Sequence, residues 1–403
     1  MSKRVLLISP TPTHPVTAGN RQVFFSLARE FKKMGFEIHC LYLPLESCDM
    51  GAMNNFFEGR LYTFDRSLYY SKQPPLHYYI KRIRRLFAGI RNRVLLATGK
   101  IDKDSFKYNG SIDDFLTPYA YFFTKQLAAQ KKFDIVVCEY VWISGLLDIF
   151  QKNVFKIIDT HDKFGDRFRV LKETGKEPQW VSLYPAEEAK GLKRADLVIA
   201  LNESERAYFE KAAGNKAILY FDVPDPRHLE KKIFSNTLLY FGSGNDINVA
   251  SVEYFIENHF EKIRQKIPAV KLLIGGKICE KLTVNKTGIA LKGSYDDPGE
   301  FYKQGDIVIN PELTGTGLKM KALEALSFGL PLIASHAGLR GITQPDYGHY
   351  RVAESAEEYV AAISELSANE LLREQMAGNA SRWLLYYKNK LASELKQNLP
   401  GLN

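Results

Sequence analysis

Cysteine is scarce in this 403-residue chain, and long apolar runs are missing. Cys40, Cys48, Cys138 and Cys279 are scattered without metal-ligand spacing, which indicates a reduced, cytoplasmic protein rather than a disulfide scaffold or a zinc site. No stretch approaches the length of a membrane span, and residues 1–4 lead directly into an apolar run. We therefore expect neither a transmembrane helix nor a signal peptide.

The composition is that of a soluble globular protein, with 45% apolar and 25% charged residues, and the length favours two domains. Lysine and arginine number 55 against 46 acidic residues, so the net charge is +9. This balance suits anionic substrates, an anionic membrane surface or nucleic acid, and does not choose among them. No recognised nucleic-acid motif accompanies the charge, so we expect no nucleic-acid partner.

The N-terminus predicts a strand–helix–strand unit with Gly19 at the strand-to-helix junction. Apolar runs at residues 4–9 and 36–43 are the expected strands, and helically spaced apolar residues lie between them. The full G-x-G-x-x-G pattern is missing, so we do not expect a nicotinamide cofactor.

Residues 310–342 carry the most informative pattern in the chain. An expected buried strand at 306–309 leads into a loop with Gly315 and Gly317, and a helix with apolar spacing follows from Leu318. In open α/β sheets, a glycine-rich loop feeding a helix N-terminus is a site for anions, because free amide N–H groups and the helix dipole point at the ligand.

Charged residues near the start of that helix support the same interpretation. Lys319 and Lys321 oppose the helix dipole, which suggests that a phosphate compensates them. Glu324 lies among apolar neighbours and can accept bonds from two sugar hydroxyls. The alternative is a solvated helix face with an i,i+3 ion pair between Lys321 and Glu324.

The run K-A-L-E-A-L-S-F-G-L-P from Lys321 to Pro331 resembles the donor-site signature of the group 1 glycosyltransferases, which are retaining enzymes of the GT-B fold. The resemblance implies an α/β protein with two Rossmann-like domains facing across a cleft. It assigns the donor's ribose to Glu324, and the diphosphate to the loop Gly315–Gly317 and to Lys319 or Lys321.

The chain departs from the family pattern at two places. Thr316 stands where many members have a second glutamate near the donor sugar, and it is a candidate for a hydroxyl contact. Ser243 stands where many members have an arginine after the F-x-G turn, and no lysine lies nearby. Phosphate binding is therefore expected to fall on Lys319, Lys321 and backbone amides.

The first domain carries further matches. Residues 155–159 form an expected strand that runs into D-T-H-D, which resembles the family motif whose histidine lies by the donor sugar. We assign His161 a positioning and electrostatic role, with Asp162 beside it; a histidine that caps a strand end is the alternative. Gly19 resembles the first-loop glycine of GT-B enzymes, and Arg21 and Arg167 are acceptor-side candidates. A turn glycine with a surface arginine is the alternative for Gly19 and Arg21.

The proline-containing segment 221–226 is the best domain boundary. We expect an acceptor domain at 1–222 and a donor domain at 236–382, with a final helix within 383–403 that packs back on the first domain. Residues Ile80–Val94 form a basic amphipathic helix that suits an anionic membrane surface. The alternative is a helix that packs on the first domain with a solvated basic face.

These features together predict transfer of a sugar from a nucleotide-diphosphate donor to a glycan or lipid-linked acceptor. Retention is expected, as is a setting in bacterial cell-surface polysaccharide assembly, with the enzyme cytoplasmic or peripheral on the membrane. We expect no cofactor and no obligatory metal, since no D-x-D stands out. Two alternatives are a non-catalytic nucleotide-sugar-binding subunit and another sugar-nucleotide enzyme, an epimerase or hydrolase, on the same fold.

Overall fold

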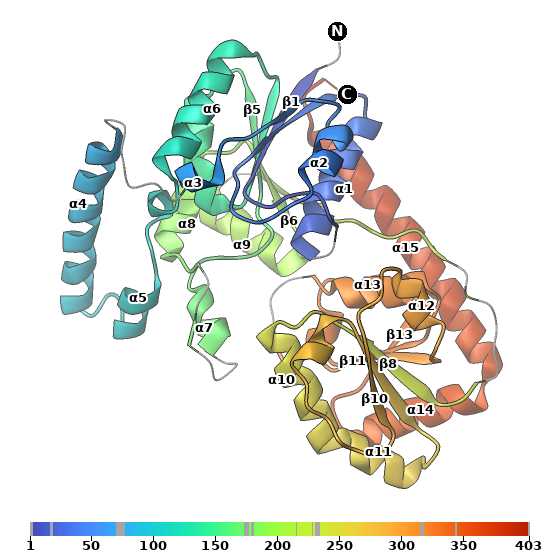
Figure 1. Ribbon diagram of the computed structural model, residues 1–403. Coiled ribbons are helices and arrows are strands. Elements are labelled where there is room, and N and C mark those ends of the chain that lie inside the picture. Colours follow the sequence, from blue (N-terminus) through green and yellow to red (C-terminus); the bar gives the residue numbers. More distant parts are fainter. Residues whose placement is uncertain are drawn as a thin grey trace. The chain divides into compact units, whose positions relative to one another are not determined.

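The computed structural model describes residues 3–16, 19–69, 77–172, 177–178, 181–214, 216–227, 229, 234–314, 318–342 and 345–401. The chain divides into two compact units (Figure 1). The N-terminal unit comprises Met1–Asp222 and Leu391–Asn403, and the C-terminal unit comprises Val223–Lys390. Each unit is an α/β structure built on a parallel sheet, as the sequence predicts.

The sheet of the N-terminal unit has the strand order β3-β2-β1-β4-β5-β6-β7. Its strands are β1 (Arg4–Ser9), β2 (Glu37–Tyr42), β3 (Leu61–Tyr62), β4 (Ile135–Glu139), β5 (Phe155–Asp159), β6 (Leu197–Ala200) and β7 (Lys216–Leu219). The central strands are apolar and buried along almost their whole length, as expected for a parallel sheet that is covered on both faces.

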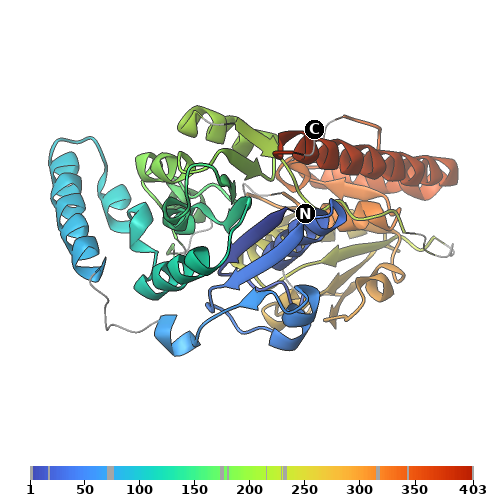
Figure 2. The ribbon, with the colours of Figure 1, turned by 90° about the horizontal axis from the view of Figure 1, so that it is seen from above.

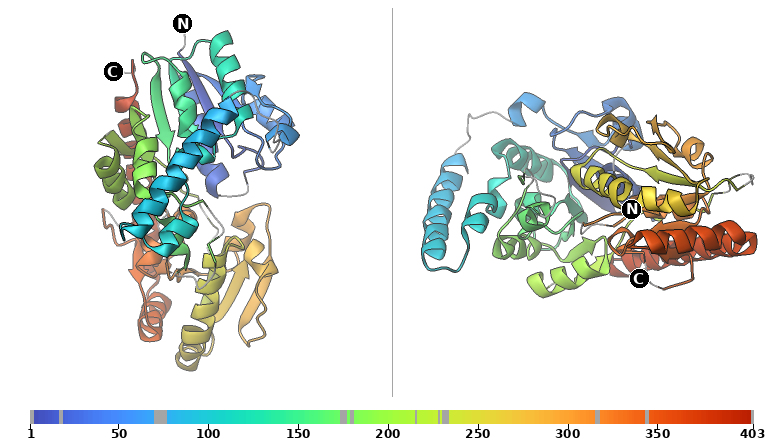
Figure 3. Two further views of the ribbon diagram at one scale, coloured as in Figure 1. Left: turned by 90° about the vertical axis from the view of Figure 1, so that its left-hand side faces the viewer. Right: turned by 90° about the horizontal axis from the view of Figure 1, so that it is seen from below.

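Helices and short 3₁₀ segments connect these strands. They are α1 (Gly19–Lys33), α2 (Met50–Phe56), α3 (Arg66–Tyr69), α4 (His77–Ala97), α5 (Lys103–Tyr108), η1 (Ile112–Asp114), α6 (Pro118–Gln130), η2 (Val141–Ile149), α7 (Arg167–Lys172), α8 (Pro185–Leu192) and α9 (Glu203–Ala213). Figure 2 shows the blue and the green helices on opposite sides of this sheet. In Figures 1 and 3, α4 stands at the outer edge of the unit.

The sheet of the C-terminal unit has the order β10-β9-β8-β11-β12-β13. Its strands are β8 (Thr237–Phe241), β9 (Lys271–Gly275), β10 (Ile289–Gly293), β11 (Ile307–Asn310), β12 (Leu332–Ala334) and β13 (Tyr350–Val352). The other elements are α10 (Asp246–Phe255), η3 (Ile256–Phe260), α11 (Glu261–Lys266), η4 (Lys277–Glu280), α12 (Pro298–Tyr302), α13 (Met320–Ser327), η5 (Ala337–Leu339), α14 (Ala356–Ala368) and α15 (Glu370–Asn398).

Both sheets reverse their strand order at one point, between β1 and β4 in the first and between β8 and β11 in the second. The connections that follow two neighbouring strands then run in opposite directions, and in open α/β sheets ligands bind at the carboxyl ends of the strands beside such a point. The loops after β1, β4, β8 and β11 are therefore the places where ligand-binding side chains are expected in each unit.

Two local predictions need correction. The helix expected from Trp383 begins at Glu370, because apolar side chains continue on its buried side from Met376 through Ala380. The helix expected from Leu318 begins at Met320. Among the described residues, no helix combines the length and the apolarity that crossing a bilayer requires.

Gly276 follows β9 at a place where the backbone leaves no space for a side chain. Its φ is +91°, and a Cβ would overlap the carbonyl oxygen of Gly242. We expect Gly276→Ala to lower the free energy of unfolding by about 2 kcal/mol or more, because strain and overlap add. Gly378→Ala is the matched control, since Gly378 is a helical glycine with open space around its Cα, and it should stabilise by about 0.5 kcal/mol. Equal urea midpoints for both variants would contradict the expectation.

Candidate functional site

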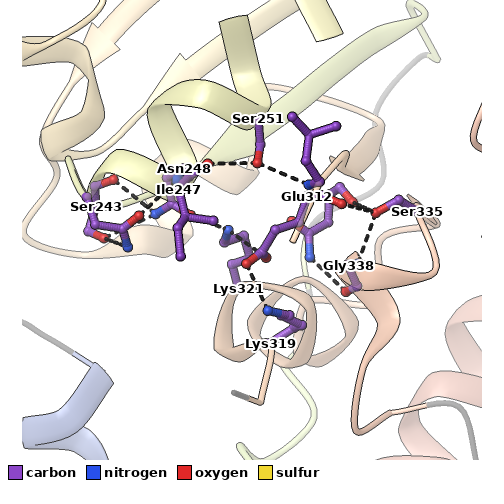
Figure 4. Close-up of polar contacts among 12 residues, drawn as sticks. Ser243, Ile247, Asn248, Ser251, Glu312, Lys319, Lys321, Ser335 and Gly338 are labelled. Atoms are coloured by element: carbon purple, nitrogen blue, oxygen red, sulfur yellow. Dashed lines mark hydrogen bonds and ion pairs between the residues drawn. The ribbon is translucent and has the colours of Figure 1, made fainter. Parts of the chain in front are cut away.

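The loop between β11 and α13 lies at the strand-order reversal of the C-terminal unit and is fixed by polar contacts (Figure 4). The Ser335 hydroxyl donates to the Glu312 carbonyl at 2.6 Å and accepts from the Gly338 amide at 2.9 Å. The Leu313 amide donates to the Ser251 hydroxyl at 3.2 Å. These bonds hold the backbone around Glu312 between α10 on one side and the turn after β12 on the other.

Glu312 binds both lysines of the predicted phosphate site. Lys319 Nζ lies 2.8 Å from Oε1, and Lys321 Nζ lies 3.3 Å from Oε2. The carboxylate is buried. Burial opposes its ionisation, but the attraction of Lys321 and Lys319 outweighs burial and holds the pKa of Glu312 below its ordinary value. One buried carboxylate therefore compensates two ammonium groups, and the cluster keeps an excess positive charge.

Lys321 also connects α13 to the loop after β8. Its Nζ donates to Asn248 Oδ1 at 2.6 Å and to the Tyr240 hydroxyl at 3.3 Å. Asn248 Nδ2 in turn donates to the Ser243 carbonyl at 3.0 Å. Burial works against the charge of Lys321, yet Tyr240 and Glu312 raise the pKa of this lysine above its ordinary value. For Lys319, burial dominates and lowers the pKa.

Glu324 lies on α13, and one of its oxygens is occupied. The hydroxyl of the buried Tyr302 donates to Oε2 at 3.1 Å, so Oε1 is the oxygen left for a ligand. Burial raises the pKa of Glu324, although the bond from Tyr302 opposes this shift. The predicted loop residues Gly315, Thr316 and Gly317 lie outside the described part of the chain.

The alternative ion pair between Lys321 and Glu324 is wrong. Lys321 turns to Glu312, Asn248 and Tyr240, and Glu324 turns to Tyr302. Sequence reasoning gave Glu312 no role. Its charge was the signal that could have revealed it. Glu312 lies in the loop just before two lysines at a helix start, and a carboxylate there can pair with those lysines as a phosphate can.

A second cluster surrounds His161 in the N-terminal unit. His161 Nε2 lies 2.6 Å from Glu139 Oε2 and 4.0 Å from Asp159 Oδ2, and all three residues are buried. Glu139 ends β4, and Asp159 ends the neighbouring β5, so the parallel pairing brings their carboxylates together. His161 follows with a φ of +59°, a strained backbone conformation that occurs mainly at functional positions.

Tyr140 connects this cluster to the loop after β1. Its ring stacks on that of His161, with 4.2 Å between centroids, and its φ is +75°. Its hydroxyl lies 3.3 Å from both Thr11 Oγ1 and Asn20 Nδ2. Since β1 and β4 are the strands between which the order reverses, Tyr140 spans the reversal point of the first sheet.

Burial controls the protonation of the His161 cluster. It raises the pKa of Glu139 well above its ordinary range and lowers the pKa of His161. Both shifts favour the uncharged pair, in which protonated Glu139 donates to Nε2 and the ring proton lies on Nδ1. Burial also raises the pKa of Asp159 to about 7, and the nearby Glu139 adds to this shift, whereas His161 opposes it.

Glu139, Asp159 and His161 have ligand atoms within 4.8 Å of one another, a spacing that can hold a metal ion. In this structure, Nε2 and Oε2 lie at hydrogen-bond distance.

The other predicted residues of the N-terminal unit lie near carboxylates or at a helix start. Asp162 Oδ2 accepts from Arg167 Nη2 at 3.0 Å. Arg21 Nη2 lies 2.7 Å from Glu46 Oε2, and the same guanidinium donates to the Ser47 carbonyl. Gly19 is the first residue of α1. Arg21 and Arg167 are thus both engaged in ion pairs, which sequence reasoning did not anticipate.

A protein-family model matches most of the C-terminal unit. Residues 235–369 match the family model described as Glycosyl transferases group 1. The chain thus contains a group 1 glycosyltransferase domain, as its sequence predicts, and this domain carries the lysine–glutamate cluster. No curated protein matches the sequence.

Solved structures show that the resemblance in fold spans the chain. Sucrose-phosphate synthase from Thermosynechococcus elongatus matches with a TM-score of 0.65 at 15% identity over 98% of both chains. The pneumococcal O-GlcNAc transferase GtfA in complex with UDP and GlcNAc matches with 0.65 at 11% over 100% of this chain and 99% of that one. Anabaena HepE in complex with UDP and glucose matches with 0.59 at 12% over 98% and 99%. The fold is GT-B.

Removing the shared carboxylate tests the lysine cluster. Glu312→Gln leaves the buried ammonium group of Lys319 and the partly buried one of Lys321 without a counter-charge, so we expect it to lower the free energy of unfolding by about 3 kcal/mol. Pyrophosphate should restore more of the melting temperature in this variant than in the wild type. Glu300→Gln, which breaks an exposed pair with Lys303, is the control and should change stability by less than about 0.5 kcal/mol. Equal losses in the two variants would contradict the assignment.

Asp159 provides a pH test of the His161 cluster. Folding raises the pKa of Asp159 from 3.8 to about 7, so the folded state binds its proton more tightly than the unfolded state does. This preference stabilises the fold fully below the unfolded pKa, and the stabilisation is lost as the pH rises through 7. Asp159→Asn cannot titrate, so its stability relative to the wild type should increase by at least about 1 kcal/mol between pH 5 and pH 8. Urea midpoints at both pH values measure this, with the exposed Asp104→Asn as control. A difference that is independent of pH would contradict the burial of an ionisable Asp159.

Proposed function

We propose that this protein transfers a sugar from a nucleoside-diphosphate donor to a glycan or lipid-linked acceptor. The observation that carries the proposal is the pairing of Lys319 and Lys321 beside Glu324 at the reversal point of a sheet, inside a group 1 glycosyltransferase domain. Excess positive charge, a helix start and a carboxylate with one open oxygen together suit a phosphorylated sugar nucleoside.

In this proposal, the C-terminal unit binds the nucleotide part of the donor. Lys321 and Lys319 hold the diphosphate together with backbone amides of the segment Gly315–Gly317, and Thr316 contacts a sugar hydroxyl. Glu324 accepts a hydrogen bond from a ribose hydroxyl at Oε1, while Tyr302 keeps Oε2 in place. The same lysines stabilise the negative charge that develops on the leaving diphosphate.

The transfer breaks the bond between the anomeric carbon and the β-phosphate oxygen, and it forms a bond from that carbon to an acceptor hydroxyl oxygen, whose proton is released. We assign His161 an electrostatic role at the sugar. With Nε2 held by Glu139, Nδ1–H is the donor that remains for a sugar oxygen. The stack on Tyr140 and the strained backbone keep the ring from turning.

The finer features of the reaction belong to the same proposal. The transfer occurs with retention at the anomeric carbon and without an obligatory metal, because the lysines take the role of the cation. Gly19 approaches the donor phosphates in the first loop, Asp162 assists His161, and Arg21 and Arg167 face the acceptor. The setting is assembly of a bacterial cell-surface polysaccharide.

A donor screen by thermal shift is the direct test, because a ligand of the native state raises the melting temperature. UDP, GDP, ADP and CMP sugars are compared on the wild type, on Glu324→Ala and on the surface control Glu300→Ala. UDP sugars come first, because two of the structural neighbours were solved with UDP. We expect one nucleotide class to shift the wild type and Glu300→Ala by several degrees and Glu324→Ala by much less.

Turnover with the donor so identified separates the alternatives. We expect release of nucleoside diphosphate to depend on an acceptor and to fall at least about 100-fold in His161→Ala, with the donor-induced shift retained. Free sugar or an epimer without acceptor product would replace the proposal with another sugar-nucleotide reaction. Binding without any turnover would favour a non-catalytic subunit, and no shift with any donor in folded protein would overturn the donor site.

A further inference from the structure

Helix α4 exposes a row of large apolar side chains. The exposed fractions are 61% for Leu86, 69% for Phe87, 55% for Ile90 and 56% for Val94. Leu86, Ile90 and Val94 follow one another at intervals of four residues, and Phe87 lies beside them, so they form one continuous stripe along the helix. We name these four residues the α4 stripe.

The opposite side of α4 attaches the helix to its unit. Asn92 is buried, and Leu95 and Leu96 are half-buried. Arg91, which lies between this side and Phe87 on the helical surface, adds a further contact: its Nη2 donates to Glu187 Oε1 on α8 at 2.9 Å. The α4 stripe therefore points away from the N-terminal unit, in agreement with the position of the helix at the outer edge in Figures 1 and 3.

Helix α4 contains six lysines and arginines and no aspartate or glutamate. The basic residues are Lys81, Arg82, Arg84, Arg85, Arg91 and Arg93. Arg93 is exposed and lies next to the α4 stripe on the helical surface. The sequence prediction for this helix also rests on Ile80 and Ile83; the side chains of 77–85 lie outside the described residues.

We propose that α4 binds the surface of a bilayer that contains anionic phospholipid, lying in the plane of the interface. The α4 stripe enters the boundary between headgroups and acyl chains, Arg93 beside it approaches a headgroup phosphate, and the helix has no acidic residue that an anionic surface would repel. Each basic residue near an anionic surface strengthens binding about five-fold. The helix contacts the rest of its unit through its other side, so this attachment needs no rearrangement of the sheet.

Charge decides between this occupant and a second copy of the chain. Two α4 helices joined through their stripes would bring basic residues together without any acidic residue in either helix to compensate them. An anionic lipid surface supplies that compensation along the whole helix. The proposal concerns attachment only and does not depend on glycosyl transfer.

Vesicle co-sedimentation of the full chain tests this attachment. Vesicles of phosphatidylcholine alone are compared with vesicles that contain one third phosphatidylglycerol, at low and at high salt. The test variant is Phe87→Ser with Ile90→Ser, which should keep the wild-type melting temperature because both side chains are exposed. The control is Leu371→Ser on α15, where the leucine is 63% exposed.

We expect the wild type and the control to bind the anionic vesicles, with binding at least 10-fold weaker on phosphatidylcholine alone and at high salt. The double variant should bind at least 10-fold more weakly than the control. Absence of binding by the wild type would overturn the proposal, as would equal binding by the double variant. Light scattering that shows a dimer in the wild type and a monomer in the double variant would assign the stripe to a second copy instead.

Discussion

Parallel strand pairing with one reversal of strand order is the constraint on which the rest of this structure depends. The central strands are buried on both faces, so they have almost no room for polar side chains along their length. Polar chemistry is therefore confined to the residues that follow the strands. Glu139 and Asp159 end neighbouring strands, and Asn310 and Phe241 end the strands beside the second reversal, so both clusters arise at the carboxyl edges of the sheets.

The sequence predicted the central strands and several of the residues at these edges, among them His161, Lys321 and Glu324, but it predicted neither Glu139 and Glu312 nor the contacts that these residues make. The apolar runs that predict strands, the glycines at the ends of elements and the spacing from Lys321 to Glu324 are all local features of the sequence. The bond between Glu139 and His161 joins residues 22 positions apart, and it exists only because β4 and β5 pair in one register. The role of Glu312 likewise depends on the folded loop, which places its carboxylate against Lys319 and Lys321 at the start of α13.

The position of Lys321 explains how the chain manages without the basic residues that the family resemblance leads one to expect after the F-x-G turn. Ser243 and Asn248 are uncharged, but Asn248 on α10 accepts a hydrogen bond from Lys321 on α13. The loops that lead to these two helices follow β8 and β11, which pair directly. Positive charge can therefore be delivered to the same place from either loop, and in this chain α13 supplies it.

The carboxylate of Glu312 is a counter-ion of Lys319 and Lys321 that is covalently tethered to the same chain. Any anion that approaches Lys319 or Lys321 competes with a tethered ligand whose effective concentration is far above that of free anions in solution. A small monovalent anion makes few contacts and is therefore a weak competitor of the carboxylate. A ligand that binds at several points simultaneously gains more, so this single acidic side chain favours extended polyanions over small anions.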